Sequence, residues 1–278
     1  MPKVTRQAPP ANKKAASRGS SVLDRIAPIQ MPDRGLQVAI YGRSGTGKTT
    51  LAATFPKPLL LVRPPDDDGR LSIYNVSGID DAPIYSLDEM EELLPLMASG
   101  KYATVVLDNA SALQDLVMKK VLGLEEIPTQ LSWGVADQSQ WGEIGLAMKE
   151  ILRRLLDLTC NTVVLAQERE FNADANVTDF LTPYVNCGLS PSVASWIGPK
   201  VNYLCNTFIR EVEELYESNQ VVHNKKVKLK RKVIQYCLRT GPHPVYNTKF
   251  RVPMGTPLPE LIVNPTYDKI LKLIRGGK

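Results

Sequence analysis

The segment GRSGTGKT at residues 42–49 has the residue types and spacing of a phosphate-binding loop. An apolar run at residues 38–41 precedes it, and a helix-forming run at 50–55 follows. Its glycines let consecutive backbone N–H groups point at phosphate oxygens, while Lys48 reaches the terminal phosphates and Thr49 offers a hydroxyl to Mg²⁺. The alternative is a chance glycine-rich turn, but the flanking strand and helix favour a nucleoside triphosphate site. The residues expected to bind the nucleotide are Gly42, Arg43, Ser44, Gly45, Thr46, Gly47, Lys48, Thr49 and Thr50.

Asp108 ends another apolar run, residues 102–107. A carboxylate in this position can hold the water shell of Mg²⁺ beside Thr49. The alternative is a helix N-cap for a segment that begins near Ser111. The phosphate loop upstream favours the magnesium role.

Two further candidates follow other predicted strands. An acidic segment follows the apolar run at 57–62, where a carboxylate can orient or deprotonate an attacking water. Asp68 is the preferred candidate for this role and Asp67 the second. A solvated acidic turn is the alternative. Gln167 leaves the run at 161–166, where its amide can contact the γ-phosphate and relay its loss to the next loop; a neutral loop residue is the alternative.

Two groups of cations lie towards the C-terminus. Lys249 and Arg251 point to the same side of a predicted strand, and at a subunit boundary they can reach a neighbour's γ-phosphate. Surface charge is the alternative. A second group can follow a nucleic acid backbone from one strand face, and consists of Lys226, Lys228, Lys230 and Lys232. Alternatively, these lysines protect an edge strand or pair across a hairpin with Glu211, Glu213, Glu214 and Glu217.

These residues require a particular arrangement of strands and helices. Buried strands are predicted at residues 38–41, 57–62, 102–107 and 161–166, with helices at 86–97 and through 144–158. Their alternation predicts an α/β fold, a doubly wound parallel sheet with its ligand at the carboxyl ends of the strands. Strands at 201–217, 227–240 and 245–252, with turns at Ser218-Asn219 and Gly241-Pro242, predict an antiparallel extension. A last helix is expected at 267–274.

The segment 171–199 is long and polar, and we expect an irregular loop whose order depends on the nucleotide. Four aromatic residues in it can stack on bases: Phe171, Phe180, Tyr184 and Trp196. Packing of these rings on the core is the alternative.

Charge and cysteine usage limit the class of protein. The 34 basic and 29 acidic residues leave a net charge of +5, and residues 1–20 carry five cations without an acid. We expect residues 1–34 to be a disordered basic tail, either a nucleic acid contact or a solubilising leader, and residues 35–278 to be one domain. The four cysteines are scattered, which predicts reduced thiols and a cytoplasmic location. No stretch suggests a signal peptide or a membrane span. His223 and His243 have no partner at the spacing of metal ligands, so we expect no zinc site.

Together, these segments resemble small phage-type ATPases with a RecA-like core, the group that includes the short single-strand annealing recombinases. The resemblance covers residues 37–253 and rests on GRSGTGKT at 42–49, VRPPDDDG at 62–69, VVLDNAS at 105–111, VVLAQERE at 163–170 and YCLRTGPHPVYNTKFRVP at 236–253. One departure is the acidic segment, because RecA-like ATPases usually have a glutamate as catalytic base where Asp residues stand here. We also expect this chain to lack the additional DNA-binding domains of full-length recombinases.

The resemblance implies ATP and Mg²⁺ binding by Gly47, Lys48, Thr49 and Asp108, a sensor at Gln167 and an intersubunit pair at Lys249 and Arg251. It further implies homo-oligomers, rings or filaments, on single-stranded DNA, often with a single-strand-binding protein, in the host cytoplasm if a phage encodes the chain. The expected function is ATP-dependent DNA binding for recombination or annealing. Two alternatives are a nucleotide-gated assembly factor that binds proteins and a P-loop kinase for a small molecule.

Overall fold

The computed structural model describes residue 26 and residues 34–64, 69–124, 136–172, 183–222 and 225–276, without the side chains of 216–229. Residues Arg34–Lys278 form one compact unit. The tail predicted at 1–34 lies outside the described residues, apart from Ile26 and Arg34. Among the described residues, no helix combines the length and the apolar character that crossing a membrane requires.

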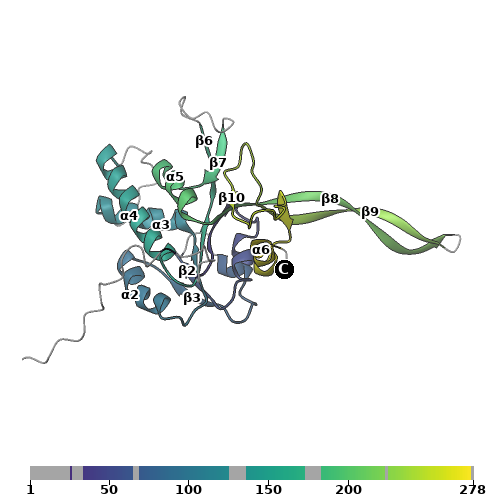
Figure 1. The fold of residues 1–278 in the computed structure, drawn as a ribbon, viewed down its shortest axis with the longest axis horizontal. Helices are drawn as coiled ribbons and strands as arrows, with labels where there is room; N and C mark the ends of the chain where they lie inside the picture. The colour runs from purple at the N-terminus through teal and green to yellow at the C-terminus, as the bar shows by residue number, and fades with distance from the viewer. Residues whose placement is uncertain are drawn as a thin grey trace, which may run out of the picture. The chain divides into compact units, whose positions relative to one another are not determined.

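The main sheet has nine strands (Figure 1). In chain order they are β1 (Gln37–Gly42), β2 (Pro58–Val62), β3 (Asp80–Pro83), β4 (Thr104–Asp108), β5 (Asn161–Ala166), β8 (Tyr203–Val222), β9 (Lys225–Arg239), β10 (Lys249–Phe250) and β11 (Leu261–Val263). Strands β8-β1-β5-β4-β2-β3 are neighbours in that order and all parallel, whereas β9, β10 and β11 pair antiparallel. A second sheet pairs β6 (Glu168–Phe171) with β7 (Tyr184–Cys187). This confirms the predicted α/β class, a doubly wound, mostly parallel sheet with a C-terminal antiparallel extension.

Helices cover both faces of the sheet because successive strand residues point to opposite sides. They are α1 (Lys48–Ala52), the 3-10 helix η2 (Gly69–Ser72), α2 (Leu87–Ala98), α3 (Ala110–Leu122), α4 (Gln138–Leu156), α5 (Pro191–Lys200) and α6 (Tyr267–Ile274). Ala39 and Tyr41 of β1 belong to the core beneath α2, α3, α4 and α5, whereas Val38 and Ile40 belong to the core beneath α1 and α6. The phosphate loop follows the central strand β1, which lies between β5 and β8.

The predicted helices are confirmed where their sequence signals are strong. Ser86 accepts a hydrogen bond from the Glu89 backbone N–H at 3.2 Å and caps α2. Ile144, Met148 and Leu152 are fully buried on one side of α4, as the helical spacing predicted. The last helix begins at Tyr267 and ends at Ile274, within the predicted bounds.

Three predictions for the C-terminal half are wrong. Strand β8 does not end at Ser218-Asn219 but continues to Val222, with a register irregularity between Glu217 and Val221 that absorbs the turn-forming residues. The segment 171–199 is not one irregular loop, because it contains β7 and α5; residues 173–182 lie outside the described residues. The strand predicted at 245–252 is reduced to the two residues of β10.

Candidate nucleotide site

The phosphate loop has the backbone conformation that its glycines allow. Gly45 and Gly47 have φ angles of 78° and 83°, in the left-handed region that favours glycine. The Thr46 hydroxyl bonds to Arg43 O and to the Thr207 hydroxyl, both at 2.8 Å, which fastens the loop to the adjacent strand β8. The loop therefore leads directly from β1 into the N-terminus of α1, where anions are stabilised.

Lys48 lies inside the loop, and its side chain connects the loop to the end of β5. The residue is only 7 % exposed. Its Nζ donates to Gly42 O and Arg43 O at 2.8 Å each, and to Gln167 Oε1 at 3.3 Å. The structure thus brings the proposed sensor, Gln167, to the lysine expected to bind the terminal phosphates.

Thr49 and Asp108 form the second part of the site. The Thr49 hydroxyl donates to Asp108 Oδ2 at 2.7 Å. The N-cap alternative for Asp108 is wrong, because Asn109 caps α3 by accepting from the Ala112 N–H at 2.9 Å. A hydroxyl beside a buried carboxylate is a donor set that fits Mg²⁺ with its water shell.

Gly69 lies against the same two side chains. A Cβ built on it would come closer than 3.0 Å to both Asp108 Oδ2 and Thr49 Oγ1. Only a residue without a side chain allows the backbone this close to the predicted metal site. The adjacent candidates for the catalytic base, Asp67 and Asp68, lie outside the described residues.

These residues line a cavity of about 670 Å³. Ser44 to Thr50 contribute to it, together with Gly69 and Asp108, whereas Gly42 and Arg43 do not line it. Gly42 lies against Thr207, and Arg43 pairs with Glu168 at 2.8 Å. This bond, more than any other interaction, raises the pKa of the Arg43 guanidinium.

The far side of the cavity was not predicted from the sequence. It is lined by Thr54, Ser72, Tyr236, Asn264, Pro265 and Thr266. The Tyr236 ring lies 3.2 Å from the position of a Cβ built on Gly47. Asn264 N donates to Tyr236 O at 2.7 Å, and Lys269 Nζ donates to the Asn264 carbonyl at 2.8 Å. An aromatic ring beside a fixed turn suits the nucleoside half of a nucleotide.

The predicted pair of Lys249 and Arg251 lies towards the start of β8, whereas the phosphate loop lies further along that strand. Lys249 is opposite Leu204, near the start of β8, whereas Gly42 is opposite Thr207. Lys249 Nζ donates to three carbonyl oxygens around the C-terminus of α5, at 2.8–3.2 Å: those of Gly198, Pro199 and Val201. Burial, and after it Arg251, lowers the pKa of Lys249. Arg251 is exposed and donates to Asn202 Oδ1 at 2.9 Å.

The proposed DNA-binding lysines divide into two pairs. Lys230 bonds to Glu213 at 3.0 Å, and Lys232 pairs with Glu211 at 2.7 Å. These two lysines therefore follow the alternative considered above, cross-strand pairing with glutamates. The side chains of Lys226 and Lys228 lie outside the described residues, but their backbones are opposite Val221 and Glu217.

The described aromatic residues of segment 171–199 pack on the protein. Phe171 is buried and stacks on Tyr184 with ring centroids 5.4 Å apart. Trp196, on α5, packs against the same core. These three rings follow the core-packing alternative, and Phe180 lies outside the described residues.

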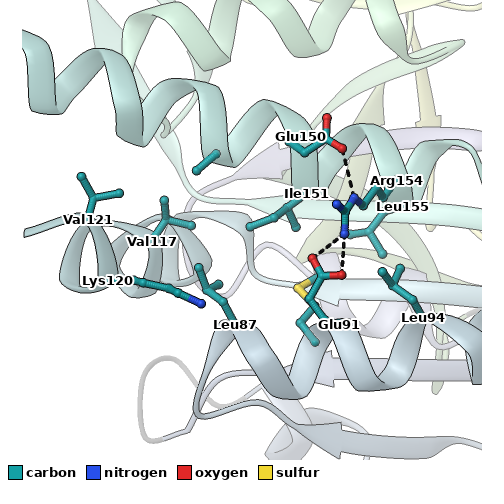
Figure 2. A pocket seen from close by; sticks show the side chains of 12 residues that line it. Leu87, Glu91, Leu94, Val117, Lys120, Val121, Glu150, Ile151, Arg154 and Leu155 are labelled. Carbon is teal, nitrogen blue, oxygen red and sulfur yellow. Dashed lines mark hydrogen bonds and ion pairs between the residues drawn. The ribbon is translucent and has the colours of Figure 1, made fainter. Parts of the chain in front are cut away.

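A second cavity, of about 410 Å³, lies between α2, α3 and α4 (Figure 2). Its lining is mostly aliphatic, and Arg154 spans its rim between Glu91 and Glu150. It shares no residue with the nucleotide cavity.

No group of three or more His, Cys, Asp or Glu residues suited to a metal occurs in the described part of the chain. All four cysteines are free thiols, as predicted.

Comparisons with known proteins identify a family for this chain. The family described as AAA domain matches residues 34–252. No curated protein matches the sequence. Among solved structures, a KaiC-like protein from the hyperthermophilic archaeon Pyrococcus horikoshii OT3 aligns with 84 % of this chain and 90 % of its own, at 14 % identity and a TM-score of 0.38. The family match covers most of the chain and includes the phosphate loop, Asp108 and Gln167. The chain therefore belongs to the AAA domain family and is a P-loop ATPase.

Proposed function

We propose that this ATPase is Mg²⁺-dependent and binds single-stranded DNA in phage homologous recombination or strand annealing. The observation that carries the ATPase part is the convergence of Lys48, Thr49 and Asp108 on one cavity, with the Thr49 and Asp108 oxygens 2.7 Å apart. Bound Mg²⁺ would supply positive charge beside the β- and γ-phosphates. Thr49 and Asp108 would hold it, and the loop N–H groups and Lys48 would hold the phosphates.

The catalytic base proposed here is Asp68, with Asp67 as the second candidate. Gly69, the next residue, lies against Thr49 and Asp108, and consecutive Cα atoms are about 3.8 Å apart. Chain connectivity thus supports a carboxylate near the metal. Substitution Asp68→Asn should lower turnover about 100-fold with little change in nucleotide affinity. Equal turnover of Asp68→Asn and wild type, with Asp67→Asn inactive, would reverse the two assignments.

Gln167 is proposed to sense the terminal phosphate. Its amide oxygen accepts from Lys48 Nζ, and the next residue, Glu168, begins β6. An arriving phosphate competes for the same ammonium group, which would release Gln167 and alter the start of β6. Substitution Gln167→Ala should therefore leave nucleotide affinity within about threefold of wild type while removing the dependence of DNA binding on ATP.

The DNA contact is proposed at the tip of the β8–β9 hairpin, at Lys226 and Lys228. No acidic residue occurs between 218 and 229, whereas the described cations Lys230 and Lys232 are paired with glutamates. Basic residues are therefore in excess towards the tip of the ribbon, although the backbone of Lys228 is opposite Glu217. A basic tip on a projecting ribbon suits the phosphates of a single strand.

We also propose that the chain forms homo-oligomers, either rings or filaments, with ATP bound between subunits. A single-strand-binding protein in the host cytoplasm is proposed as a further partner. Arg251 bonds to Asn202, just before β8 begins, whereas the phosphate loop is beside Thr207 further along that strand, which favours an action of this pair on a neighbour's nucleotide. Arg251, being exposed, is the better candidate. Mixing Lys48→Ala with Arg251→Ala subunits should restore part of the activity, since some interfaces then contain both intact groups. No rescue at any ratio would contradict a shared site.

Fluorescence anisotropy of a labelled single strand tests the DNA-binding function. We expect ATP-dependent binding whose logarithm falls linearly with the logarithm of salt concentration. The double variant Lys226→Gln, Lys228→Gln should reduce that slope by about 1.4, because each phosphate contact contributes about 0.7 on single strands. The matched control, Lys230→Gln with Lys232→Gln, removes ion-paired charges and should change the slope less. Unchanged anisotropy at low salt would refute DNA binding while leaving ATP hydrolysis intact.

A second candidate function is a nucleotide-gated assembly factor that binds protein. It is favoured by one observation, the exposed apolar residues Ile209, Leu215 and Ile234 on the hairpin. It predicts ATP turnover that DNA does not stimulate. Stimulation of turnover by single-stranded DNA would exclude it.

A further inference from the structure

The turn from β11 into α6, residues 264–266, lines the nucleotide cavity together with Tyr236. The phosphate loop and Asp108 line another part of the same cavity. The phosphates and Mg²⁺ are expected beside the loop, because its backbone N–H groups, Lys48 and Thr49 lie there. The base of a bound nucleotide is then left with the part that the turn and Tyr236 line.

This turn is held in place by hydrogen bonds to three other parts of the chain. Asn264 N donates to Tyr236 O at 2.7 Å, and Lys269 Nζ donates to Asn264 O at 2.8 Å. Tyr267 N donates to the Thr54 hydroxyl at 2.8 Å, which ties the turn to the segment after α1. Both backbone polar groups of Asn264 are therefore used within the protein, and its side chain is held at a fixed place on the cavity wall.

The side-chain amide of Asn264 is available to a ligand. It makes no hydrogen bond to any described residue, and Asn264 is the only residue with a side-chain amide among the described ones that line the cavity. The residue has a φ of 47°, in the left-handed region that asparagine tolerates and glycine adopts without strain. The backbone of the turn thus requires nothing from the amide itself.

The hydroxyl groups on this wall are less suited to distinguishing one base from another. The Thr54 hydroxyl donates its only proton to Leu51 O at 2.7 Å and accepts from Tyr267 N. The Thr266 hydroxyl accepts from Lys269 N at 3.4 Å as the N-cap of α6. A hydroxyl can also rotate to donate or to accept, whereas an amide has one donor side and one acceptor side in a single plane.

The amide matches adenine and does not match guanine on the edge that carries N7. Adenine presents there an amino donor at N6 and an acceptor at N7, so an asparagine amide pairs with it through two hydrogen bonds. Guanine presents two acceptors, O6 and N7, which leave the amide oxygen without a partner. Stacking on a ring such as that of Tyr236 is open to every base. Discrimination between the two purines therefore depends on Asn264.

We infer that Asn264 selects adenine, with its amide oxygen accepting from N6 and its amide nitrogen donating to N7, while the Tyr236 ring stacks on the base. The inference rests on the proposed function, because it takes the cavity to hold the nucleotide. Asn264 is then the specificity-determining residue of the site. Its contribution is separate from that of the phosphate loop, whose contacts are the same for every nucleoside triphosphate.

Isothermal titration calorimetry with Mg²⁺ and three nucleotides tests this assignment: ADP, GDP and 7-deaza-ADP, in which a C–H group replaces N7. Diphosphates are used because the protein does not hydrolyse them during the titration. Asn264→Gly keeps the backbone conformation and removes the amide. The matched control is Lys57→Gly, because Lys57, with φ 41°, is the other non-glycine residue in the left-handed region among those described, and it does not line the cavity.

We expect the wild type and Lys57→Gly to bind ADP about tenfold more tightly than GDP, and 7-deaza-ADP several-fold more weakly than ADP. Asn264→Gly should bind ADP about tenfold more weakly than wild type and GDP equally well, so that the preference disappears. Asn264→Asp accepts but does not donate, so it should bind ADP and 7-deaza-ADP alike. Tyr236→Leu should weaken ADP and GDP to a similar extent.

Equal affinities of the wild type for ADP and GDP would overturn the inference and leave the proposed function standing. Equal losses of ADP and GDP affinity in Asn264→Gly would also overturn it, since they would indicate a purely structural role of Asn264. Absence of binding by all three diphosphates would overturn both the inference and the proposed nucleotide site. The two failures are therefore distinguishable in one set of titrations.

Discussion

Thr49 and Asp108 lie 59 residues apart in the chain, yet their side-chain oxygens are 2.7 Å apart. Thr49 lies in the first turn of α1, and Asp108 is the last residue of β4, two strands away from β1 in the sheet. The carboxyl ends of parallel strands meet at one edge, which explains how these distant residues come together. Gly69 closes over the pair and leaves no space for a Cβ.

The substitution Gly69→Ala should therefore weaken Mg²⁺-dependent nucleotide binding. The new Cβ would come closer than 3.0 Å to Asp108 Oδ2 and Thr49 Oγ1, so these two oxygens must separate or the backbone must move away. We expect affinity for ATP with Mg²⁺ to fall about tenfold, which corresponds to about 1.4 kcal/mol, and affinity in EDTA to change less. Isothermal titration calorimetry under both conditions measures the difference.

The control for this substitution is Gly142→Ala. A Cβ on Gly142, in α4, meets nothing within 4 Å, so this variant should bind nucleotide like wild type. Equal losses in both variants would point to a general effect on folding. An unchanged affinity of Gly69→Ala with Mg²⁺ would contradict the placement of the metal beside Thr49 and Asp108.

Asp108→Asn separates the charge of the carboxylate from its hydrogen bond. The amide oxygen can still accept from Thr49, but without the negative charge it binds a divalent cation more weakly. We expect ATP turnover to fall about 100-fold, with unfolding free energy within about 0.5 kcal/mol of wild type. Asp157→Asn, at the exposed C-cap of α4, makes the same chemical change far from the cavity and should keep full turnover. Steady-state phosphate release distinguishes the two.

Much of the nucleotide site could be predicted from the sequence because its signals are local. The phosphate loop is one short motif, and Asp108 and Gln167 each follow an apolar run of five or six residues. Parallel strands then bring these residues together without any further information. The N-cap role of Asn109 was missed, although an Asn directly before a helical segment is a common cap.

The nucleoside side of the cavity could not be predicted, because it depends on the register between distant strands. Tyr236 reaches Gly47 only because β9 pairs with β8, and β8 pairs with β1. Asn264 joins it through β11, whose pairing with β9 has no local signature. Helix α5 did have a usable signal, Pro191 at its first turn, but its glycine and second proline disguised it.

Lys249 and Arg251 should differ in their effects on stability. Lys249 Nζ donates to three carbonyl oxygens at the C-terminus of α5, whereas Arg251 makes one exposed bond to Asn202. Lys249→Met leaves those carbonyls without this donor, and we expect a loss of about 1–3 kcal/mol in unfolding free energy. Arg251→Met should stay within about 0.5 kcal/mol of wild type. Chemical denaturation measures both, and equal losses would contradict this division of roles.

His243 should make the stability of the following turn depend on pH. Its Nδ1 accepts hydrogen bonds from the backbone N–H groups of Val245 and Tyr246, both at 3.1 Å. Only the neutral ring can accept these bonds, because the imidazolium has no free lone pair. Burial first, and then the charge of Arg239, lowers the pKa of His243 below its ordinary 6.5, while Glu260 opposes this shift.

The direction of the effect follows from that lowered pKa. As pH falls below 6.5, the unfolded chain takes up a proton at this position before the folded chain does, which favours unfolding. The stabilisation is complete above pH 6.5 and is lost as pH falls through the folded pKa. We expect a loss on the order of 1 kcal/mol, since two backbone donors lose their acceptor. His243→Asn keeps an acceptor at every pH, so the pH dependence of its unfolding free energy should be smaller by that amount. An NMR titration that places the His243 midpoint above 6.5 would contradict the argument.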